Sequence, residues 1–283
     1  MLAKIQARLC RAAVYTGTAF SVSVLVLIVG YILVKGIPHL SPELFAWKYN
    51  STNVSMMPAI INTLLMTLLS LLVCVPLGIG AAIWLTEYAP RGSRLVKLVR
   101  MTAETLSGIP SIIYGLFGSL FFVVALKMGM SLLSGALTLS IMVLPTIMRT
   151  TEEALLAVPD SYRESSFGLG SGRFRTTFKV VLPSAVPGIL SGVILAIGRI
   201  VGETAALIYT AGTVAKVPGS LLDSTRTLSV HMYAISTEGL YMDQSYATAV
   251  VLLVMVLLIN SLSALIARKV GRSPAGRIRG KHA

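Results

Sequence analysis

Long apolar stretches without charge alternate with short polar segments along the chain. A helix needs about 20 predominantly apolar residues to cross the roughly 30 Å hydrocarbon core of a bilayer. The pattern predicts six transmembrane helices, at residues 12–34, 58–86, 105–126, 128–148, 180–215 and 244–267. Arg199 and Glu203, both in the fifth stretch, are the only charged residues inside any of them. We therefore expect an all-α, polytopic membrane protein without a sizeable soluble domain.

Composition and charge agree with this expectation. Charged residues make up 12% of the chain and apolar residues 55%, whereas soluble domains carry about 25% charged residues. Of the 24 Lys and Arg residues, 18 flank the predicted helices on one side, five flank them on the other, and Arg199 lies within a helix. Because cytoplasmic loops are enriched in Lys and Arg, we place both termini and the loop at 149–180 in the cytoplasm.

The net charge of +13 includes a basic C-terminal tail at 268–283. Anionic lipid headgroups are a sufficient partner for such a tail. No aromatic residues are interleaved with its basic residues, so the tail lacks the stacking groups typical of single-stranded nucleic-acid binding. We expect membrane lipid, and no nucleic acid, as its partner.

A polar, charged segment lies between the fourth and fifth predicted helices. Ser161 and Glu164 have the spacing of a capping box, so a helix is expected to begin near Ser161. Gly170 suits the left-handed turn that ends a helix, and a second short helix is expected at 172–182, ending before Pro183. Two interpretations are open: the pair docks on a cytoplasmic partner, or it lies on the bilayer surface.

The charged residues inside the fifth predicted helix are a second unusual feature. Arg199 and Glu203 are four residues apart, which places both on one face of a continuous helix. A charge at the bilayer centre costs about 2.5–3.5 kcal/mol on insertion scales and is usually functional. Either the two residues line a water-filled pathway, where the Arg fork binds an oxyanion, or they form an ion pair that fixes helix register. Four glycines in the same stretch permit close approach of another helix: Gly188, Gly192, Gly198 and Gly202.

The sequence offers no catalytic or metal-binding constellation. There is no Walker A pattern, no defensible Ser-His-Asp order and no metal-ligand spacing. His39, His231 and His282 fall in predicted loops or the tail, where we expect them to be solvated. Cys10 and Cys74 lie in different environments, so no disulfide is expected. We therefore expect no enzyme activity and no cofactor bound by this chain itself.

The polar segment resembles a family signature. Its spacing is similar to the Glu-Ala-Ala, Gly, Ile-x-Leu-Pro signature of ABC importer permeases, and this chain differs from it by Ser165, Ser166 and Val180. The residues that carry the match, with the nearby apolar Phe167, are Glu164, Ser165, Ser166, Gly170, Leu182 and Pro183.

Three other motifs narrow the resemblance to phosphate permeases. Residues 109–118 resemble their third-span motif, Arg-Thr-Thr-Glu at 149–152 resembles their fourth-span exit, and 198–205 resembles their Gly-Arg-x-x-Gly-Glu-Thr signature. Ala205 stands where C-type phosphate permeases usually have Met, so the chain is more similar to the A type. The resemblance covers roughly residues 58–267.

This resemblance implies a type I ABC importer transmembrane domain at 58–267, with cytoplasmic coupling helices at about 152–183. Residues 1–57 would then hold an N-terminal cytoplasmic segment, the first transmembrane helix and an external loop. The implied phosphate pathway includes Arg199, Glu203 and Thr204. The implied partners are a C-type sister permease, an ATPase dimer that binds ATP and Mg²⁺, and an extracytoplasmic phosphate-binding protein, all at a bacterial cell membrane.

Two alternative functions remain open from the sequence. The first is a permease for another oxyanion, such as molybdate or sulfate, although those permeases usually lack the Arg/Glu pair. The second is an ion-coupled secondary transporter or channel that uses Arg199 and Glu203 as a gate. A secondary transporter has no need for the spacing of the polar segment, which favours the ABC importer.

Overall fold

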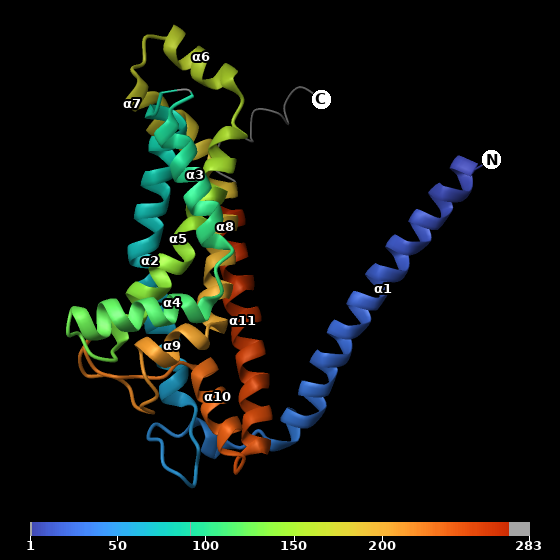
Figure 1. Cartoon of the computed structure of the whole chain (residues 1–283), viewed down its shortest axis with the longest axis vertical. Helices are drawn as coiled ribbons and strands as arrows, with labels where there is room; N and C mark the ends of the chain where they lie inside the picture. The colour runs from blue at the N-terminus through green and yellow to red at the C-terminus, as the bar shows by residue number, and fades with distance from the viewer. Residues whose placement is uncertain (1, 91, 272–283) are drawn as a thin grey trace.

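The computed structural model describes residues 2–90 and 92–271 and is helical throughout, without a strand in these residues (Figure 1). The all-α prediction is confirmed, whereas residues 272–283 of the predicted basic tail lie outside the described part. The helices α1 to α11 span Leu2–Gly36, Met57–Ile83, Arg94–Ser107, Ser111–Gly118, Leu132–Leu156, Asp160–Gly168, Arg173–Thr176, Leu182–Gly202, Ala205–Thr210, Leu228–Glu238 and Met242–Gly271. Three π-helical segments extend some of them: Trp84–Tyr88, Ser119–Ala125 and Thr177–Val181.

Most of the predicted membrane spans are present as long apolar helices. Five stretches have the length and hydropathy to cross a membrane: Cys10–His39, Met57–Tyr88, Leu132–Leu156, Arg173–Gly202 and Met242–Ala267. A sixth passes the same test only as two pieces, Arg94–Ser107 and Ser111–Ala125, which meet at 103°. The predicted span at 105–126 is therefore present only as part of a sharply bent pair of helices that begins earlier, at Arg94.

The break in this third span has a local cause at Pro110. Proline has no backbone N–H, and it disfavours the helical conformation in the residue before it. α3 accordingly ends at Ser107, and Pro110, with φ −57° and ψ 140°, precedes the first residue of α4. α4 then runs across the bundle instead of along it (Figure 1).

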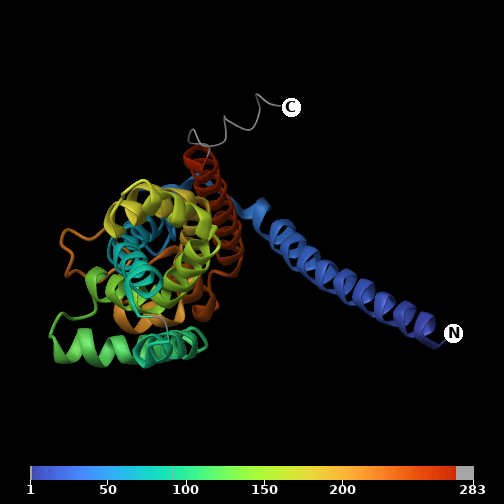
Figure 2. The same ribbon diagram turned by 90° about the horizontal axis from the view of Figure 1, so that it is seen from above.

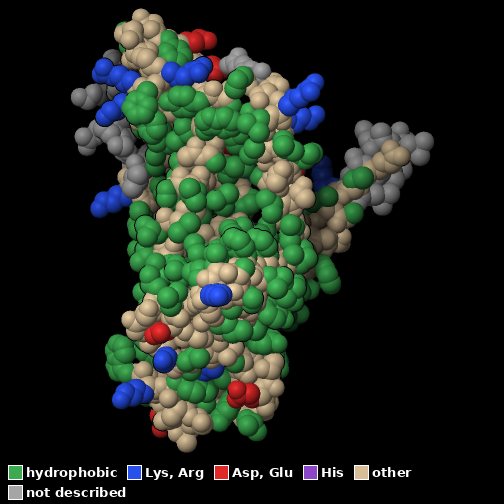
Figure 3. All heavy atoms as spheres, turned by 60° about the vertical axis from the view of Figure 1, so that its left-hand side comes forward, with side chains coloured by type: hydrophobic (Ala, Val, Ile, Leu, Met, Phe, Trp, Pro, Cys, Tyr) green, Lys and Arg blue, Asp and Glu red, His purple; other side chains and the backbone are tan. Residues whose placement is uncertain are grey.

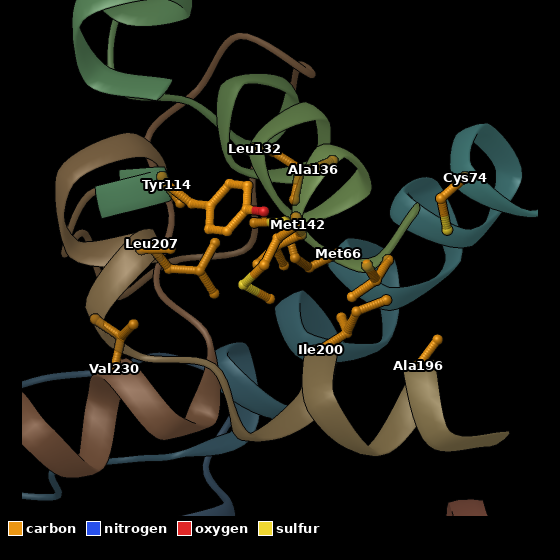
Figure 4. Close-up of a cluster of buried hydrophobic side chains, with 14 of the residues drawn as sticks. Met66, Cys74, Tyr114, Leu132, Ala136, Met142, Ala196, Ile200, Leu207 and Val230 are labelled. Atoms are coloured by element: carbon orange, nitrogen blue, oxygen red, sulfur yellow. The ribbon is translucent and has the colours of Figure 1, made fainter. Parts of the chain in front are cut away.

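The core lies between α2, α5 and α8, closed on one side by α4 and α9. A cluster of buried side chains from these elements fills it (Figure 4), including Met66, Tyr114, Met142, Ile200 and Leu207. The outward faces of the same helices are also apolar, with Leu64, Leu68 and Leu195 exposed, as expected of helices that span a membrane.

Glycines in α8 allow it to lie very close to α5. A Cβ atom at Gly188 would lie 2.6 Å from the Ala154 Cβ, and one at Gly192 would overlap the Thr150 side chain. The expected close approach of another helix at these two glycines is confirmed, and the approaching helix belongs to the same chain. Gly202, in contrast, has nothing within 4 Å of its Cβ position.

α1 leaves the bundle and extends away from it (Figures 1 and 2). It contacts the rest of the molecule near its C-terminal end, where the Tyr31 and Tyr246 rings meet edge to face at 5.9 Å. A Cβ atom at Gly36 would lie 2.8 Å from the Tyr246 carbonyl carbon. Its apolar stretch is exposed along its length within the described chain.

The polar segment between α5 and α8 forms helices, with boundaries that differ from the prediction. α6 begins at Asp160 after Pro159, and Ser161 makes no capping hydrogen bond. The second helix does not stop before Pro183 but continues from α7 through the π-helical turn into α8. Pro183 follows directly after the π-helical turn Thr177–Val181, where the regular i to i−4 hydrogen-bond pattern is already interrupted.

Charged side chains gather at the two ends of the molecule, with mostly hydrophobic side chains on the face between them (Figure 3). One end, here called the α6 end, carries α6 and α7, and α1 and α11 direct their terminal residues toward it (Figure 1). The opposite end, the α10 end, carries α10 and the loops before α2 and α10.

Candidate functional sites

The first candidate site is the surface formed by α6 and the turn after it. Gly170 has φ +80°, and its N–H donates to the Phe167 carbonyl at 2.9 Å, so the left-handed turn expected at Gly170 is present. Glu164 and Ser165 are exposed on α6, and the Phe167 side chain is about half exposed. All four residues lie on α6 or in the turn that follows it, and α6 lies at the α6 end of the molecule (Figure 1).

The other residues of the same signature differ in exposure. Ser166 is buried, and its Oγ lies 2.8 Å from the Thr176 Oγ1, which joins α6 to α7. Leu182 is half-buried and Pro183 is exposed at the first turn of α8. A small residue is needed at position 166 because α7 packs directly against it.

Arg163, which no sequence motif singles out, anchors α6 to the bundle. Its Nη2 donates to Glu87 Oε1 at 2.7 Å and to the Leu155 carbonyl at 2.9 Å, and its Nη1 donates to the Val158 carbonyl at 2.8 Å. The Arg163 and Glu87 side chains are only 16% and 9% exposed. The sequence feature that could have indicated this contact is Glu87, the single acidic residue that directly follows the long apolar stretch of the second span.

A cavity of about 680 Å³ lies beside this anchor. Its lining includes Tyr88, Arg100, Phe167 and Arg173, so one wall of α6 faces open space and not packed side chains. Arg100 also pairs with the mostly buried Glu152 at 2.5 Å, which links α3 to α5.

The second candidate site is the break between α8 and α9. α8 ends at Gly202, and Glu203 is already extended, with φ −71° and ψ 131°. Arg199 and Glu203 therefore do not share a helix face, and no ion pair joins them among the described contacts. The prediction that Arg199 and Glu203 lie on one helix face is wrong because the spacing rule holds only inside a continuous helix.

Glu203 has a different role in the structure. Its Oε1 accepts a hydrogen bond from the Ala206 N–H at 3.1 Å, which caps the first turn of α9. Its carbonyl accepts from Ser229 Oγ at 2.5 Å, which ties the break to α10. Thr204 completes the turn, since its carbonyl accepts from the Leu207 N–H at 3.2 Å.

Arg199 occupies the last turn of α8 and is half-buried. Its side chain has neither a carboxylate partner nor a hydrogen bond within residues 2–90 and 92–271. A cation without a partner in an apolar span is available to an anion. Glu203 thus holds the backbone at the break between α8 and α9, whereas Arg199 is unpaired in the described residues.

The histidines are not all solvated, contrary to the sequence prediction. His231 lies in α10 and is fully buried. His39 is exposed, and its Nε2 lies 3.5 Å from an Asp243 carboxylate oxygen, whereas His282 is outside the described residues. The expectation failed at His231 because α10 packs inward, between α2 and α11, and does not lie free as an external loop.

Comparison with known proteins agrees with this architecture. Residues 74–273 match the family described as the binding-protein-dependent transport system inner membrane component. A probable ABC transporter permease, YqgI of Bacillus subtilis, is 33% identical over 260 residues, covering 86% of this chain and 88% of its own length. The phosphate transport system permease PstA of Pasteurella multocida is 35% identical, with coverages of 81% and 82%.

A C-type protein and a solved structure are also similar. The phosphate transport system permease PstC of Mesorhizobium japonicum is 33% identical, covering 77% of this chain and 75% of its own length. A chain of a bacterial alginate ABC transporter, solved in complex with its substrate-bound periplasmic protein, superposes with a TM-score of 0.68 at 17% identity, covering 92% of this chain and 96% of that one. The chain therefore belongs to the family of inner membrane permease components of binding-protein-dependent transport systems.

Proposed function

We propose that this chain is the A-type permease subunit of an ATP-driven importer that moves inorganic phosphate into a bacterial cell. The observation that carries the proposal is Arg199, an unpaired, half-buried guanidinium within a membrane-spanning segment of a chain whose relatives include phosphate permeases. A guanidinium donates two parallel hydrogen bonds to one oxyanion, and such charge-assisted bonds are strong and directional.

Glu203 and Thr204 contribute to this pathway by holding the backbone. The Glu203 carboxylate keeps α9 capped, and its carbonyl keeps the break bonded to Ser229. The carboxylate makes this backbone contact and no ion pair with Arg199 in the described residues. Arg199 thus remains charged and unpaired until an anion arrives.

The α6 end is proposed to dock on a cytosolic ATPase. Glu164, Ser165, Phe167 and Gly170 form the exposed part of this surface, which mixes a carboxylate, a hydroxyl and an aromatic ring over a tight turn. Ser166 holds α6 against α7, and Leu182 and Pro183 lead into α8. Arg163 and Glu87 then connect the docked surface to the second span.

The assembly has further components in this proposal. A C-type sister permease completes the pathway, a dimer of ATPase subunits binds ATP and Mg²⁺ and hydrolyses the nucleotide, and an extracytoplasmic binding protein delivers phosphate. The α6 end faces the cytoplasm of the bacterial cell, and the α10 end receives the substrate. This chain contributes no residue to nucleotide chemistry.

Uptake by the assembled transporter tests the proposal. The complex of both permeases and the ATPase is placed in lipid vesicles with its binding protein, and uptake of phosphate, sulfate and molybdate is measured with and without ATP. ATP-dependent uptake of phosphate in preference to the other two anions is expected. Preferential uptake of sulfate or molybdate would contradict the substrate, and uptake without ATP would favour a secondary transporter.

A further inference from the structure

The α10 end contains a buried arginine that the proposed pathway does not use. Arg226 lies in the loop between α9 and α10 and is 5% exposed. Its guanidinium carbon lies 4.6 Å from the centre of the Tyr49 ring. Its Nε and Nη2 are buried without a hydrogen-bond partner, and no carboxylate lies within ion-pair distance in the described part of the chain. A buried charge without a counter-charge is costly, which makes a missing partner the natural interpretation.

A second unsatisfied group lies on the same aromatic ring. His231 is fully buried, and its ring meets the Tyr49 ring edge to face at 6.1 Å. Neither ring nitrogen of His231 makes a hydrogen bond of normal geometry. The nearby Val54 backbone raises the pKa of the ring, but this is the smallest of the effects on it. Burial, followed by the charge of Arg226, lowers the pKa of His231 to about 3. The ring is therefore neutral at physiological pH and offers one N–H donor.

The backbone around these two side chains is well bonded, in contrast to the side chains themselves. The Asn62 amide donates to the carbonyls of Lys216 at 2.9 Å and Arg226 at 3.1 Å. The Leu228 N–H donates to Thr63 Oγ1 at 2.8 Å. The frame is thus fixed to α2. The Asn62 Oδ1 acceptor is buried without a hydrogen-bond partner, and the unsatisfied donors beside it are those of Arg226 and the His231 ring around Tyr49.

This frame is also continuous with the α8–α9 break. Ser229, three residues after Arg226, donates to the Glu203 carbonyl at 2.5 Å. Arg226 is therefore connected to Arg199 through residues 226–229 and 199–203, which this hydrogen bond joins. Tyr49 is the half-buried side chain of the group, so it is the one whose displacement would expose the unpaired donors.

We propose that Arg226 and His231 form a binding site for a small tetrahedral oxyanion at the α10 end, covered by Tyr49 in this conformation. Under the proposed function, on which the identity of the anion rests, the ligand is inorganic phosphate before it reaches Arg199. Arg226 donates its fork to the anion, and the neutral His231 ring donates one hydrogen bond. The anion supplies the counter-charge for Arg226, which has no carboxylate partner among the described residues.

The test separates this site from Arg199 by measuring bound phosphate directly. The complex carrying Arg199→Gln, which lacks the pathway cation, is purified in detergent and equilibrated with radioactive phosphate in the presence and absence of ATP. We expect this complex to retain a phosphate site, and Arg226→Gln added to it to weaken that site at least about tenfold, because the charge-assisted fork is lost. His231→Gln, which keeps a donor, should weaken it less. Tyr49→Phe is the matched control, since it keeps the ring and removes a hydroxyl without a described hydrogen bond.

Each outcome of this experiment decides the question. Phosphate binding that is the same with and without Arg226→Gln overturns the site, even if the wild-type complex imports phosphate normally. Loss of assembly in both Arg226→Gln and Arg226→Lys would assign Arg226 to folding and would also overturn it. If the wild-type complex imports sulfate or molybdate in place of phosphate, the proposed function fails, and the same binding measurement with that anion decides the Arg226 site separately.

Discussion

Gly170 shows at the scale of one residue how backbone conformation limits the coupling surface. Its φ of +80° is left-handed, while its Cβ position has nothing within 4 Å. A side chain at this position is therefore opposed by backbone strain, about 1–2 kcal/mol, and not by crowding. Gly170→Leu should give a folded, membrane-inserted protein that loses ATPase association and phosphate uptake.

Gly168→Leu is the matched control for this prediction. Gly168 is also exposed and has open space at its Cβ position, but its φ is not positive. Pull-down of the ATPase with each variant measures the difference. Full ATPase association by Gly170→Leu, or equal loss in both variants, would show that the left-handed turn is not what the ATPase requires.

His231 makes a pH dependence at the α10 end predictable. Its ordinary pKa of 6.5 is lowered to about 3 in the folded chain, so the unfolded chain takes up a proton that the folded chain refuses as the pH falls from 6.5 toward 3. The stabilising effect of the neutral ring is fully present above pH 6.5. Below it, this residue should reduce the free energy of unfolding by about 1.4 kcal/mol per pH unit.

Thermal unfolding of the purified chain in detergent at pH 7 and pH 5 measures this effect. His231→Gln cannot titrate, so its unfolding midpoint should fall less than that of the wild type between the two pH values. Equal shifts in both proteins would mean that His231 is accessible to protons in the folded state.

At individual residues, the sequence predicted local requirements but not roles that depend on packing between distant segments. The turn at Gly170 was predictable because its requirement is local. The role of Glu203 was not, because it depends on where α8 ends, and that end is fixed by the packing of α9 and by the bond from Ser229. His231 was misjudged for the same kind of reason: its burial comes from α2 and α11, which are distant in the sequence.

At the scale of elements, the link between α6 and the second span carries a prediction about coupling. Removing one partner of a buried ion pair costs about 3–5 kcal/mol, and Arg163 and Glu87 form such a pair. Arg163→Glu or Glu87→Arg alone should lower uptake more than ATP hydrolysis, because α6 stays on the ATPase but no longer moves the second span with it.

The double charge swap should restore only part of the uptake, since Arg163 also donates to the Leu155 and Val158 carbonyls. Swapping the exposed pair of Arg149 and Glu153 is the control, because exposed pairs contribute little. The measurement is the ratio of phosphate imported to ATP hydrolysed in vesicles. A proportional fall of both activities would indicate a loss of folded protein and not of coupling.

Most elements were predictable from hydropathy, and the exceptions have physical causes. α2 and α11 lie close to the predicted spans at 58–86 and 244–267 because each is one continuous apolar run. α5 begins later than the predicted span at 128–148 and ends at Leu156, because the helix continues through the charged residues of the predicted loop. α3 was missed because its charged residues interrupt the run, although its helix begins well before the predicted span. The 103° bend after it follows from Pro110, but its size depends on how α4 packs on α9: a Cβ at Gly115 would lie 2.7 Å from the Ala206 Cα.

At the scale of the whole molecule, the orientation in the membrane rests on the distribution of Lys and Arg. The two ends offer a matched pair of exposed leucines, Leu169 at the α6 end and Leu240 at the α10 end, which are 87% and 80% exposed. Single cysteines at these positions, in a background with Cys10→Ser because Cys10 is exposed, report the orientation.

An impermeant thiol reagent added to intact cells should label the Leu240→Cys variant and not the Leu169→Cys variant. The Leu169→Cys variant should react after the membrane is opened and the ATPase is removed. Labelling of Leu169→Cys in intact cells would show that the α6 end lies outside the cytoplasm, which contradicts the predicted orientation.

The direction taken by α1 is the feature of the whole molecule that hydropathy could not predict. Its apolar run specifies a span, but not what the span packs against. The helix points away from the bundle (Figure 2), and most of its described apolar side chains are exposed. What α1 packs against in the membrane depends on lipid and on partner subunits, which the hydropathy pattern of this chain does not encode.

In the proposed function, Arg199 engages the transported anion. Phosphate uptake by the reconstituted transporter carrying Arg199→Gln, compared with Arg199→Lys and with wild type at equal amounts of assembled complex, tests it most directly. We predict loss of uptake in Arg199→Gln and impaired uptake in Arg199→Lys, which keeps the charge but lacks the fork, with ATPase association preserved in both. The Arg199→Gln, Glu203→Gln double variant should also be inactive. Uptake near the wild-type rate in that assembled double variant would contradict the claim.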